Sequence, residues 1–267
     1  MKKSTAEILE EIRRQRERRA ALTRGELESE YEALKQSGYD IGLLLDFMGD
    51  LTGSKQIQYH YEMVLEDWKR SKAERLDIGH SFALRRKEGR DFLFPLLDVR
   101  NEFESVRIAA LIAESFCGKD ESETPERERL VPYLIRYTGL SSPEHRRIAL
   151  IALGWVYAPG GLEKELECIC FHMVNDGDAL CRAWSASALM QLYFHGAPVE
   201  TVKERSLSAF GQSLKNETDD FALGVAIESM KELWGFKLRL SGAAVERRDR
   251  AEIEKARKRV LKLLPAL

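Results

Sequence analysis

The feature that most constrains this chain is a short apolar segment that returns at intervals of about 40 residues. Each copy holds small and branched apolar residues, and the copies are residues 106–111, 147–154, 182–189 and 223–230. The first three copies carry an arginine, and Arg107, Arg147 and Arg182 are 40 and 35 residues apart. Such a period is typical of helical repeats, in which each pair of helices buries its apolar side against the next pair. The sequence therefore predicts an all-α chain of stacked helical pairs.

Helical periodicity and turn residues divide residues 88–234 into about four regular pairs of helices. We expect the pairs to be 88–98 with 102–117, 125–137 with 143–157, 162–174 with 178–194, and 199–214 with 219–234. Pro125 and Pro143 suit a first helical turn, where the missing N–H has no partner to lose. Alanines recur in the second helix of each pair, and small side chains let neighbouring helices approach closely. These second helices are therefore expected to be buried on both flanks.

The regions on either side of the repeats are expected to be helical but irregular. Ser4 and Glu7 have the spacing of a capping box, so a helix should begin there. The basic run at 13–19 is interpreted as a solvated helix face, with contact to an acidic partner as the alternative. Residues 41–48 are dense in leucine and predict a short buried helix, and a charged helix with an apolar stripe at 253–264 is expected to cap the array. The expected organisation is one continuous domain, with an N-terminal helical region at 1–85, repeats at 86–235 and a capping helix at 236–267.

Composition argues against several classes of protein. The chain has 42 Lys and Arg against 44 Asp and Glu, and the net charge of −2 gives no overall electrostatic case for binding nucleic acid or an anionic membrane. The N-terminus lacks the apolar core of a signal peptide, and no apolar run is long enough to span a membrane. The four cysteines lie in apolar helical patterns and are expected to be reduced. We expect a cytoplasmic protein with no membrane contact and no cofactor.

Residues with reactive side chains do not form a recognisable catalytic pattern. Cys168 and Cys170 lie about 200° apart on a helix and cannot share a tetrahedral zinc ion, although Cys168 and His172 could. We expect no metal, because a free cysteine usually behaves as a small core residue. His60 falls on the apolar stripe of an amphipathic helix at 57–68, which favours a buried residue with satisfied hydrogen bonds over a ligand. No phosphate-binding glycine loop or nucleophile elbow is present, so the chain is not predicted to be an enzyme.

The second helices resemble those of a known family of repeats. Their arginine is followed by Ile-Ala-Ala-Leu, Ile-Ala-Leu-Ile or Ala-Trp-Ser-Ala, which is similar to HEAT repeats, including the HEAT-like repeats of the phycobilisome-lyase type. The resemblance covers residues 88–234 and implies an α–α superhelix, or solenoid. In that family an arginine of the second helix commonly pairs with an acidic residue of the same or a neighbouring repeat. The resemblance therefore implies a structural ladder role for Arg107, Arg147 and Arg182, whereas the fourth copy lacks the arginine.

Residues that stacking does not require are the candidates for function. The expected pairing leaves Arg146 without a structural role, and Trp184 is surrounded by small and polar residues. Trp155 and Trp234 continue apolar stripes and are interpreted as core residues. Trp and Arg are enriched in the hot spots of protein interfaces. We therefore expect Arg146 and Trp184 to bind a protein or peptide on the concave surface of the solenoid.

Other functions are compatible with a HEAT-like scaffold. The resemblance extends to alkyl-base DNA glycosylases, which hold DNA in a basic groove with Trp and a catalytic Asp, and to bilin lyases. The sequence offers Trp and Arg but no basic surplus and no Asp that aligns with the catalytic one, so nucleic acid is the less favoured partner. A regulatory or immunity-type protein that neutralises a partner would differ from the first hypothesis only in the identity of that partner.

Overall fold

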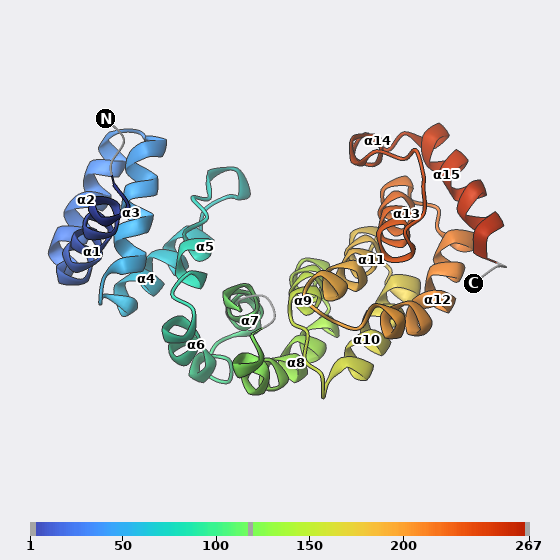
Figure 1. Cartoon of the computed structure of the whole chain (residues 1–267), viewed down its shortest axis with the longest axis horizontal. Coiled ribbons are helices and arrows are strands. Elements are labelled where there is room, and N and C mark those ends of the chain that lie inside the picture. Colours follow the sequence, from blue (N-terminus) through green and yellow to red (C-terminus); the bar gives the residue numbers. More distant parts are fainter. Residues whose placement is uncertain (1–3, 117–119, 265–267) are drawn as a thin grey trace. The chain divides into compact units, whose positions relative to one another are not determined.

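The computed structural model describes residues 4–116 and 120–264 of the chain. Within these residues every regular element is helical, with 15 α-helices, short 3-10 helices and no strand, so the predicted all-α class is confirmed. None of the described helices combines the length and the apolar character needed to cross a membrane. The chain divides into two compact units, unit 1 at Met1–Phe94 and unit 2 at Pro95–Leu267, and Figure 1 shows the order of their helices.

Unit 1 contains helices α1 to α6. They are α1 (Thr5–Ala21), α2 (Arg24–Gln36), α3 (Ile41–Gly53), α4 (Ile57–Trp68), α5 (Ile78–Ala83) and α6 (Lys87–Leu93), with a 3-10 helix, η1 (Lys72–Glu74), between α4 and α5. Helices α2, α4 and α5 pack around α3 or against one another. The core of unit 1 lies among these four helices, where Leu27, Phe47, Tyr61 and Phe82 are almost completely buried.

Hydrogen-bonded caps fix where the first helices of unit 1 begin. The Ser4 hydroxyl accepts the N–H of Glu7, and the Glu7 carboxylate accepts the N–H of Ser4 at 2.7 Å, which confirms the predicted capping box. Thr23 and Glu26 form the same arrangement at the start of α2. The first N–H groups of a helix have no partner within the helix, so these side chains stabilise the two starting points.

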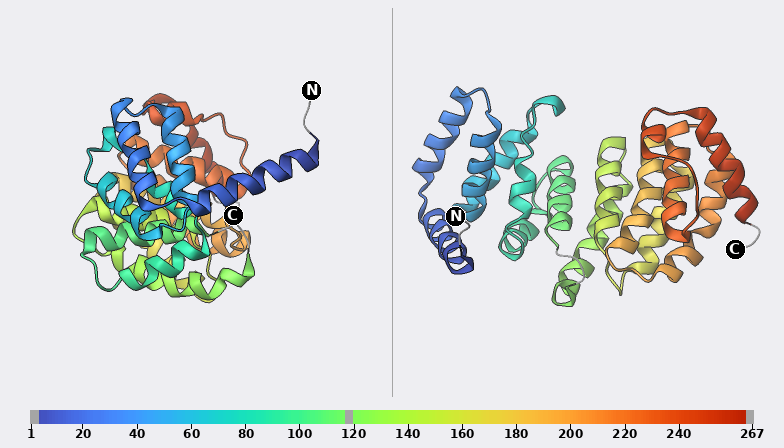
Figure 2. Two further views of the ribbon diagram at one scale, coloured as in Figure 1. Left: turned by 90° about the vertical axis from the view of Figure 1, so that its left-hand side faces the viewer. Right: turned by 45° about the horizontal axis from the view of Figure 1, so that its top comes forward.

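Helix α1 contributes no buried residue to unit 1. It is held at its C-terminal end, where Arg18 Nη2 and Arg19 Nε lie 2.6 and 2.9 Å from Oδ1 of Asp50 on α3. Arg19 lies directly against α3 because Gly53 has no side chain, and a Cβ at Gly53 would be 2.8 Å from the Arg19 Cβ. Figure 2 (left) shows the N-terminal half of α1 extending past the other helices of unit 1. The basic run is therefore solvated except at Arg18 and Arg19, which pair with Asp50 of another helix, whereas Arg13 and Arg14 form exposed pairs within α1.

Helix α3 is only partly buried, so the prediction of a buried helix at 41–48 is wrong for one of its sides. Leu44 and Phe47 face the core of unit 1, whereas Ile41 and Leu45 are 67% and 62% exposed. Residues spaced four apart share one side of a helix, so Ile41 and Leu45 form a separate apolar face. The leucine density of this segment reflects two apolar faces, of which unit 1 covers one.

Unit 2 contains helices α7 to α15. They are α7 (Glu102–Ser115), α8 (Thr124–Thr138), α9 (Pro143–Trp155), α10 (Leu162–Asn175), α11 (Ala179–Phe194), α12 (Val199–Asn216), α13 (Asp220–Trp234), α14 (Gly242–Glu246) and α15 (Arg250–Leu263), with the 3-10 helix η3 (Glu121–Glu123), and the 3-10 helix η2 (Phe94–Leu96) spans the boundary between the units. The helices predicted for the last three pairs are present, and their ends differ by at most two residues from the predicted ones.

The first predicted pair differs from the expectation. The helix predicted at 88–98 is α6 followed by the 3-10 helix η2, and the boundary between the two units falls between Phe94 and Pro95. Proline lacks an N–H, so Pro95 cannot donate the hydrogen bond that would continue the α-helix, and a short 3-10 helix follows instead. The expected first pair is therefore divided between unit 1 and unit 2.

The helices of unit 2 pack in two rows. Helices α8, α10 and α12 form the first row, helices α7, α9, α11 and α13 pack side by side in this order as the second row, and each helix of one row packs on its partner in the other (Figure 2, right). Helices α9 and α11 are especially close, since a Cβ at Gly154 would lie 2.8 Å from the Cα of Ala188. The small residues of the repeated segment thus serve close packing between neighbouring pairs.

The last long helix, α15, packs on both α12 and α13. Its Ile253, Ala256 and Val260 are buried, and its other sides are exposed and mostly charged. Helix α15 therefore covers the end of the two rows with one apolar face.

Candidate functional site

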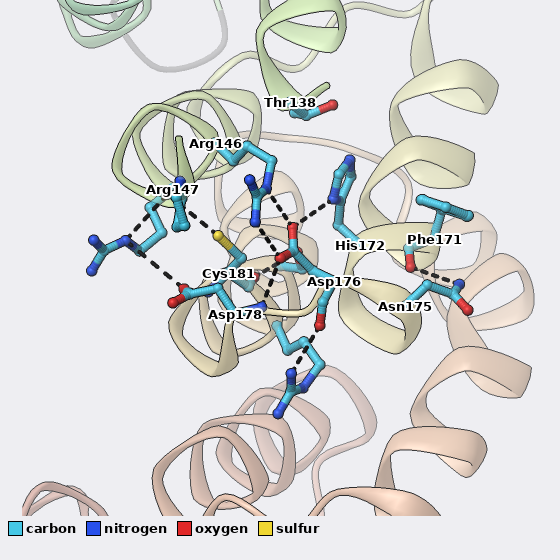
Figure 3. A network of polar contacts seen from close by, with 12 residues as sticks. Thr138, Arg146, Arg147, Phe171, His172, Asn175, Asp176, Asp178 and Cys181 are labelled. Atoms are coloured by element: carbon cyan, nitrogen blue, oxygen red, sulfur yellow. Dashed lines mark hydrogen bonds and ion pairs between the residues drawn. The ribbon is translucent and has the colours of Figure 1, made fainter. Parts of the chain in front are cut away.

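Arg146 on α9 is fully engaged in contacts within unit 2. Its Nε and Nη2 donate to Oδ2 and Oδ1 of Asp176 at 2.9 and 2.7 Å, and its Nη1 donates to the backbone carbonyls of Leu140 and Ser141 (Figure 3). A bidentate pair of this kind is the strongest arrangement of arginine with a carboxylate. The expectation that Arg146 has no structural role is therefore wrong.

Arg182 on α11 repeats this arrangement one helical pair later. Its Nε and Nη2 donate to the carboxylate of Glu217 at 2.6 and 2.9 Å, and its Nη1 donates to the backbone carbonyl of Asp176 at 2.8 Å. Asp176 and Glu217 occupy equivalent places, because each directly follows the last residue of a first-row helix, α10 or α12. We call the pairs Arg146–Asp176 and Arg182–Glu217 the two rungs. Each rung joins a second-row helix start to the end of a first-row helix in the following pair.

The carboxylates of both rungs also accept hydrogen bonds from other groups. Asp176 accepts the N–H of Asp178 at 2.9 Å and lies 3.0 Å from Nδ1 of His172, and Glu217 accepts the N–H groups of Thr218 and Asp219. Burial by itself would raise the pKa of Asp176, but Arg146 and these donors outweigh burial and lower it to about 2. Both carboxylates are therefore ionised and fully partnered in the neutral pH range.

Arg147, which the resemblance placed in the ladder, lies outside the rungs. Its Nε is 3.3 Å from the backbone carbonyl of Pro143 and 4.0 Å from Oδ1 of Asp178, and its side chain is 31% exposed. The register explains the difference, because Arg146 and Arg182 are both the fourth residue after the helix N-caps, Ser142 and Asp178. Arg146 therefore takes the bidentate structural role that was expected for Arg147, whose own ion pair with Asp178 is longer.

The first and last second-row helices depart from the two rungs. Arg107 on α7 lies 3.1 Å from Glu144 of α9, and its guanidinium lies 4.2 Å from the centroid of the Phe103 ring. Leu140 stands two residues before the N-cap of α9, as Asp176 and Glu217 do before those of α11 and α13, so no carboxylate occupies that place. On α13 the fourth residue after the N-cap is Leu223. Among the second-row helices, α9 and α11 therefore carry the arginines of the two rungs, whereas α7 and α13 have a different arrangement.

Trp184 contacts the next helix of its row. The edge of its half-buried ring faces Phe221 of α13, with centroids 6.5 Å apart, and the Arg248 guanidinium lies 5.8 Å from the centroid of Phe221. Arg146 is directed at Asp176 instead, so Arg146 and Trp184 make separate contacts. Trp234 packs on Phe210 in an edge-to-face contact.

The side of the second row that faces away from the first row forms one surface. Positions equivalent in the helix register are only half buried there: the sixth residues after the N-caps are Ile148, Trp184 and Val225, and the ninth are Ile151, Ser187 and Glu228. Residues at these spacings share one side of each helix. We call this surface, which also includes Trp155 and Phe221, the second-row face. It presents an apolar centre with Arg147 among its half-exposed neighbours.

Cys181, His172 and Asp176 occur close together but do not form a nucleophile and base. Cys181 Sγ donates to the backbone carbonyl of Pro143 at 3.4 Å, whereas the His172 ring contacts Asp176, and Figure 3 shows the two side chains on different sides of Asp176. Burial raises the pKa of Cys181 to about 12, so the thiol stays protonated. These residues therefore serve the rung and its surroundings.

His60 and Ser81 in unit 1 have the wrong hydrogen-bond polarity for catalysis. Arg85 Nε donates to His60 Nδ1 at 2.9 Å, so the ring carries its proton on Nε2, which lies 2.9 Å from Ser81 Oγ. His60 thus donates to Ser81 and cannot accept its proton. Burial and the Arg85 charge lower the pKa of His60 to about 3. The prediction of a buried histidine with satisfied hydrogen bonds is confirmed.

No metal site is found among residues 4–116 and 120–264, where no three His, Cys, Asp or Glu side chains gather closely enough to hold an ion. Cys168 Sγ lies 3.3 Å from Thr138 Oγ1, so Cys168 and His172 have separate partners. Cys168, Cys170 and Cys181 are free thiols, and Cys117 lies outside the described residues. A different buried acid, Glu165, makes no hydrogen bond of ordinary geometry within the described residues, and burial raises its pKa to about 9 although the backbone N–H of Ala158 acts to lower it.

Comparison of the chain with known protein families, with curated proteins and with experimentally determined structures found no match. The site is therefore defined by its own geometry. The sequence analysis missed the two carboxylates of the rungs, although a signal exists: Asp176 and Glu217 each stand two residues before the N-cap of a second-row helix.

Proposed function

We propose that unit 2 is a HEAT-like solenoid that binds another protein or a peptide on the second-row face, as a scaffold without catalysis of its own. The observation that carries the proposal is the second-row face itself. It holds half-buried Trp184 and Phe221 in contact with each other at the centre of three helices packed side by side. Tryptophan and arginine are enriched in interface hot spots, and a solenoid commonly offers an extended concave surface for such contacts.

The two rungs support the likeness to HEAT repeats. An arginine of a second helix paired with an acidic residue of a neighbouring repeat is the structural role that the resemblance implies. Arg146–Asp176 and Arg182–Glu217 have this relation, with both arginines at the same distance from an N-cap. Two rows of helices that pack in chain order agree with a stacked array as well.

The polar interior of unit 2 favours binding over catalysis. The arginine and carboxylate groups of the rungs bond to one another, and Cys181 and His172 are directed to separate partners. The side chains that remain half exposed on the second-row face are mainly apolar, which suits recognition of a partner with a complementary apolar surface. Arg147 replaces Arg146 as the arginine proposed for binding, because its side chain keeps exposed donors.

The proposal can be tested by affinity capture and titration calorimetry. The full chain is used to capture partners, and an identified partner is then titrated with Trp184→Ala, Arg147→Glu and, as control, Phe171→Ala. Phe171 is an exposed aromatic residue on α10 in the first row, 59% exposed. We expect Trp184→Ala to weaken binding by roughly tenfold or more and Phe171→Ala to leave it unchanged. Equal binding by Trp184→Ala and the unmodified chain contradicts the proposal.

Binding of nucleic acid is not proposed. The alternative requires a basic surface, and Arg146 and Arg182 are neutralised by the carboxylates of the rungs. The net charge of −2 adds no attraction for phosphates. Binding of duplex DNA that persists at low salt and weakens steeply with added salt would reverse this choice.

A further inference from the structure

Unit 1 leaves an apolar surface uncovered on α1 and α3. On α1, Ile8, Leu9 and Ile12 are 45%, 61% and 41% exposed, although they share one end of the helix. On α3, Ile41 and Leu45 are exposed more than halfway. Single exposed apolar residues need no explanation, but adjoining groups of them mark interaction sites.

A groove of about 480 Å³ lies between α1, α3 and α5 and reaches the exposed Leu45. Its lining includes Arg16, Arg19, Leu45, Met48 and Leu84. Arg16 follows Ile12 by four residues, so the two side chains are neighbours on one side of α1. The exposed apolar residues of α1 therefore continue into the groove. Figure 2 (left) shows that the half of α1 that carries them extends beyond α2 and α3.

The charges of α1 differ between its two halves. The first half carries Glu7, Glu10 and Glu11, and the second half carries Arg13, Arg14, Arg16, Arg18 and Arg19 with Glu17. The helix dipole favours this order only in the first and last turns, so it does not explain the residues in the middle. Pairs within the helix such as Glu10–Arg13 are exposed and contribute little. Two such helices lying antiparallel bring the acidic half of each beside the basic half of the other.

We propose that unit 1 forms a symmetric dimer in which the N-terminal half of α1 from each copy lies in the groove of the other copy. Twofold symmetry makes each copy provide one helix end and one groove, so the interface is complementary to itself. Ile8, Leu9 and Ile12 are then buried against the exposed leucines of α3 and the α5 end. An isolated helix of this length is marginal in water, and the dimer supplies the packing that α1 lacks within one chain.

The same charges favour a second copy over other occupants. An anionic membrane would attract the arginines of α1 but repel the three glutamates beside Ile8, Leu9 and Ile12. An unrelated helix would need an apolar stripe and an acidic flank of matching length, whereas a second copy provides both. The dimer involves unit 1 alone, so it does not depend on the function proposed for the second-row face.

The first test is sedimentation equilibrium of the full chain over a range of concentrations. We expect a particle of twice the mass of one chain, with an affinity that falls as salt is added. Leu9→Glu and Ile12→Glu should each raise the dissociation constant roughly 100-fold or more, since each change places two charges in the symmetric interface. Because α1 buries no residue, the variants should keep the circular dichroism spectrum of the original. Val99→Glu is the control, at a 72% exposed apolar residue outside unit 1, and should dimerise normally.

The second test exchanges charges between the halves of α1. A Glu10→Lys, Glu11→Lys chain and an Arg13→Glu, Arg16→Glu chain should each be monomeric, and an equimolar mixture should form mixed dimers. A monomeric original chain at all concentrations overturns the proposal. So does a dimer that survives Ile12→Glu, because the interface then lies elsewhere. Binding of the monomer to vesicles of phosphatidylserine and phosphatidylcholine, with loss of binding in Leu9→Glu, would overturn it in favour of a membrane surface.

Discussion

His60 in unit 1 and Glu165 in unit 2 are both buried in their neutral form, and the two differ in their hydrogen bonds. Both ring nitrogens of His60 have partners, in Arg85 and Ser81. Within the described chain the Glu165 carboxylate makes no hydrogen bond of ordinary geometry, and the backbone N–H of Ala158 offsets only part of the cost of burial. A buried polar group destabilises a protein unless its hydrogen bonds are satisfied. The comparison indicates that His60 stabilises unit 1 through its partners, whereas Glu165 costs unit 2 free energy.

The largest expected effect on stability comes from replacing His60, the buried group whose hydrogen bonds are satisfied. His60→Ala removes the acceptor of the Arg85 Nε–H in the core and opens a cavity beside Phe82, whose ring centroid is 4.9 Å from that of His60. The free energy of unfolding of unit 1 should fall by about 3 kcal/mol. Hydrogen exchange of the α4 and α5 amides, read by mass spectrometry, reports this change separately from unit 2. His80→Ala, at an exposed position, should change the value by less than about 0.5 kcal/mol, and equal effects of both variants would break the comparison.

Acidification should destabilise unit 1 before unit 2. The pKa of His60 is about 3 in the folded protein and about 6.5 in the unfolded chain, so between these values only the unfolded chain binds the proton. Stability is therefore lost as the pH falls through this window, by about 2 kcal/mol between pH 6.5 and 5. Asp176 keeps the rungs of unit 2 charged at pH 5, because its pKa is about 2. Hydrogen exchange at both pH values, corrected for the intrinsic exchange rates, checks this order, and His60→Gln should remove most of the pH dependence of unit 1.

Replacing Glu165 should raise the free energy of unfolding, in contrast to replacing His60. The pKa of Glu165 is about 9 in the folded protein, above the ordinary value of 4.5, so stability is lost as the pH rises between these values. Glu165→Gln cannot ionise and should raise the free energy of unfolding of unit 2 at pH 8 by on the order of 2 kcal/mol. Near pH 4.5 the variant and the original chain should be alike. The control is Glu163→Gln, two residues away and 62% exposed, and a gain from that change as well would show that burial is not the cause.

Arg146 provides a second comparison with Glu165 within unit 2. Its side chain is mostly buried, and its guanidinium has hydrogen-bond partners in Asp176 and two backbone carbonyls. Arg146→Lys keeps the charge but loses the bidentate contact with Asp176 and the paired carbonyls, and should destabilise unit 2 by about 1–2 kcal/mol. Arg147→Lys, one residue further on, should cost less than about 0.5 kcal/mol. Urea denaturation of both variants measures the difference. A larger loss for Arg147→Lys would mean that the rung contains the other arginine.

The sequence predicted the helices of unit 2 well because each repeat shows an apolar period and a turn. On α9 it assigned the ladder position to Arg147 instead of Arg146, because the repeated segments were aligned on their apolar residues. The position of the arginine is set by the helix start instead, and alignment on the N-caps Ser142 and Asp178 brings Arg146 level with Arg182. The rung depends on where a helix begins, which apolar periodicity does not specify.

Two other features could not be predicted from the sequence for different reasons. Periodicity identifies apolar faces but not which of them a neighbour covers, so the exposed side of α3 around Leu45 was expected to be buried. Glu165 lies between Glu163 and Glu167 in a charged helix start, where a glutamate ordinarily faces solvent. Only the packing of α10 against its neighbours shows that Glu165 is fully buried. Both cases depend on tertiary contacts that no local pattern records.

Asp176 contacts the arginines of both rungs, and these contacts define a repeating segment of fixed length between Arg146 and Arg182. Its carboxylate accepts from Arg146 while its backbone carbonyl accepts from Arg182, so one residue ends one rung and supports the next. Excision of residues 147–182 would join Arg146 to Ala183 and place Arg146 at the position from which Arg182 reaches Glu217. The same segment could be duplicated in tandem with every contact of the rung repeated. Gain or loss of this segment is therefore a route by which such a chain changes its length and the extent of its second-row face while it keeps its internal polar contacts.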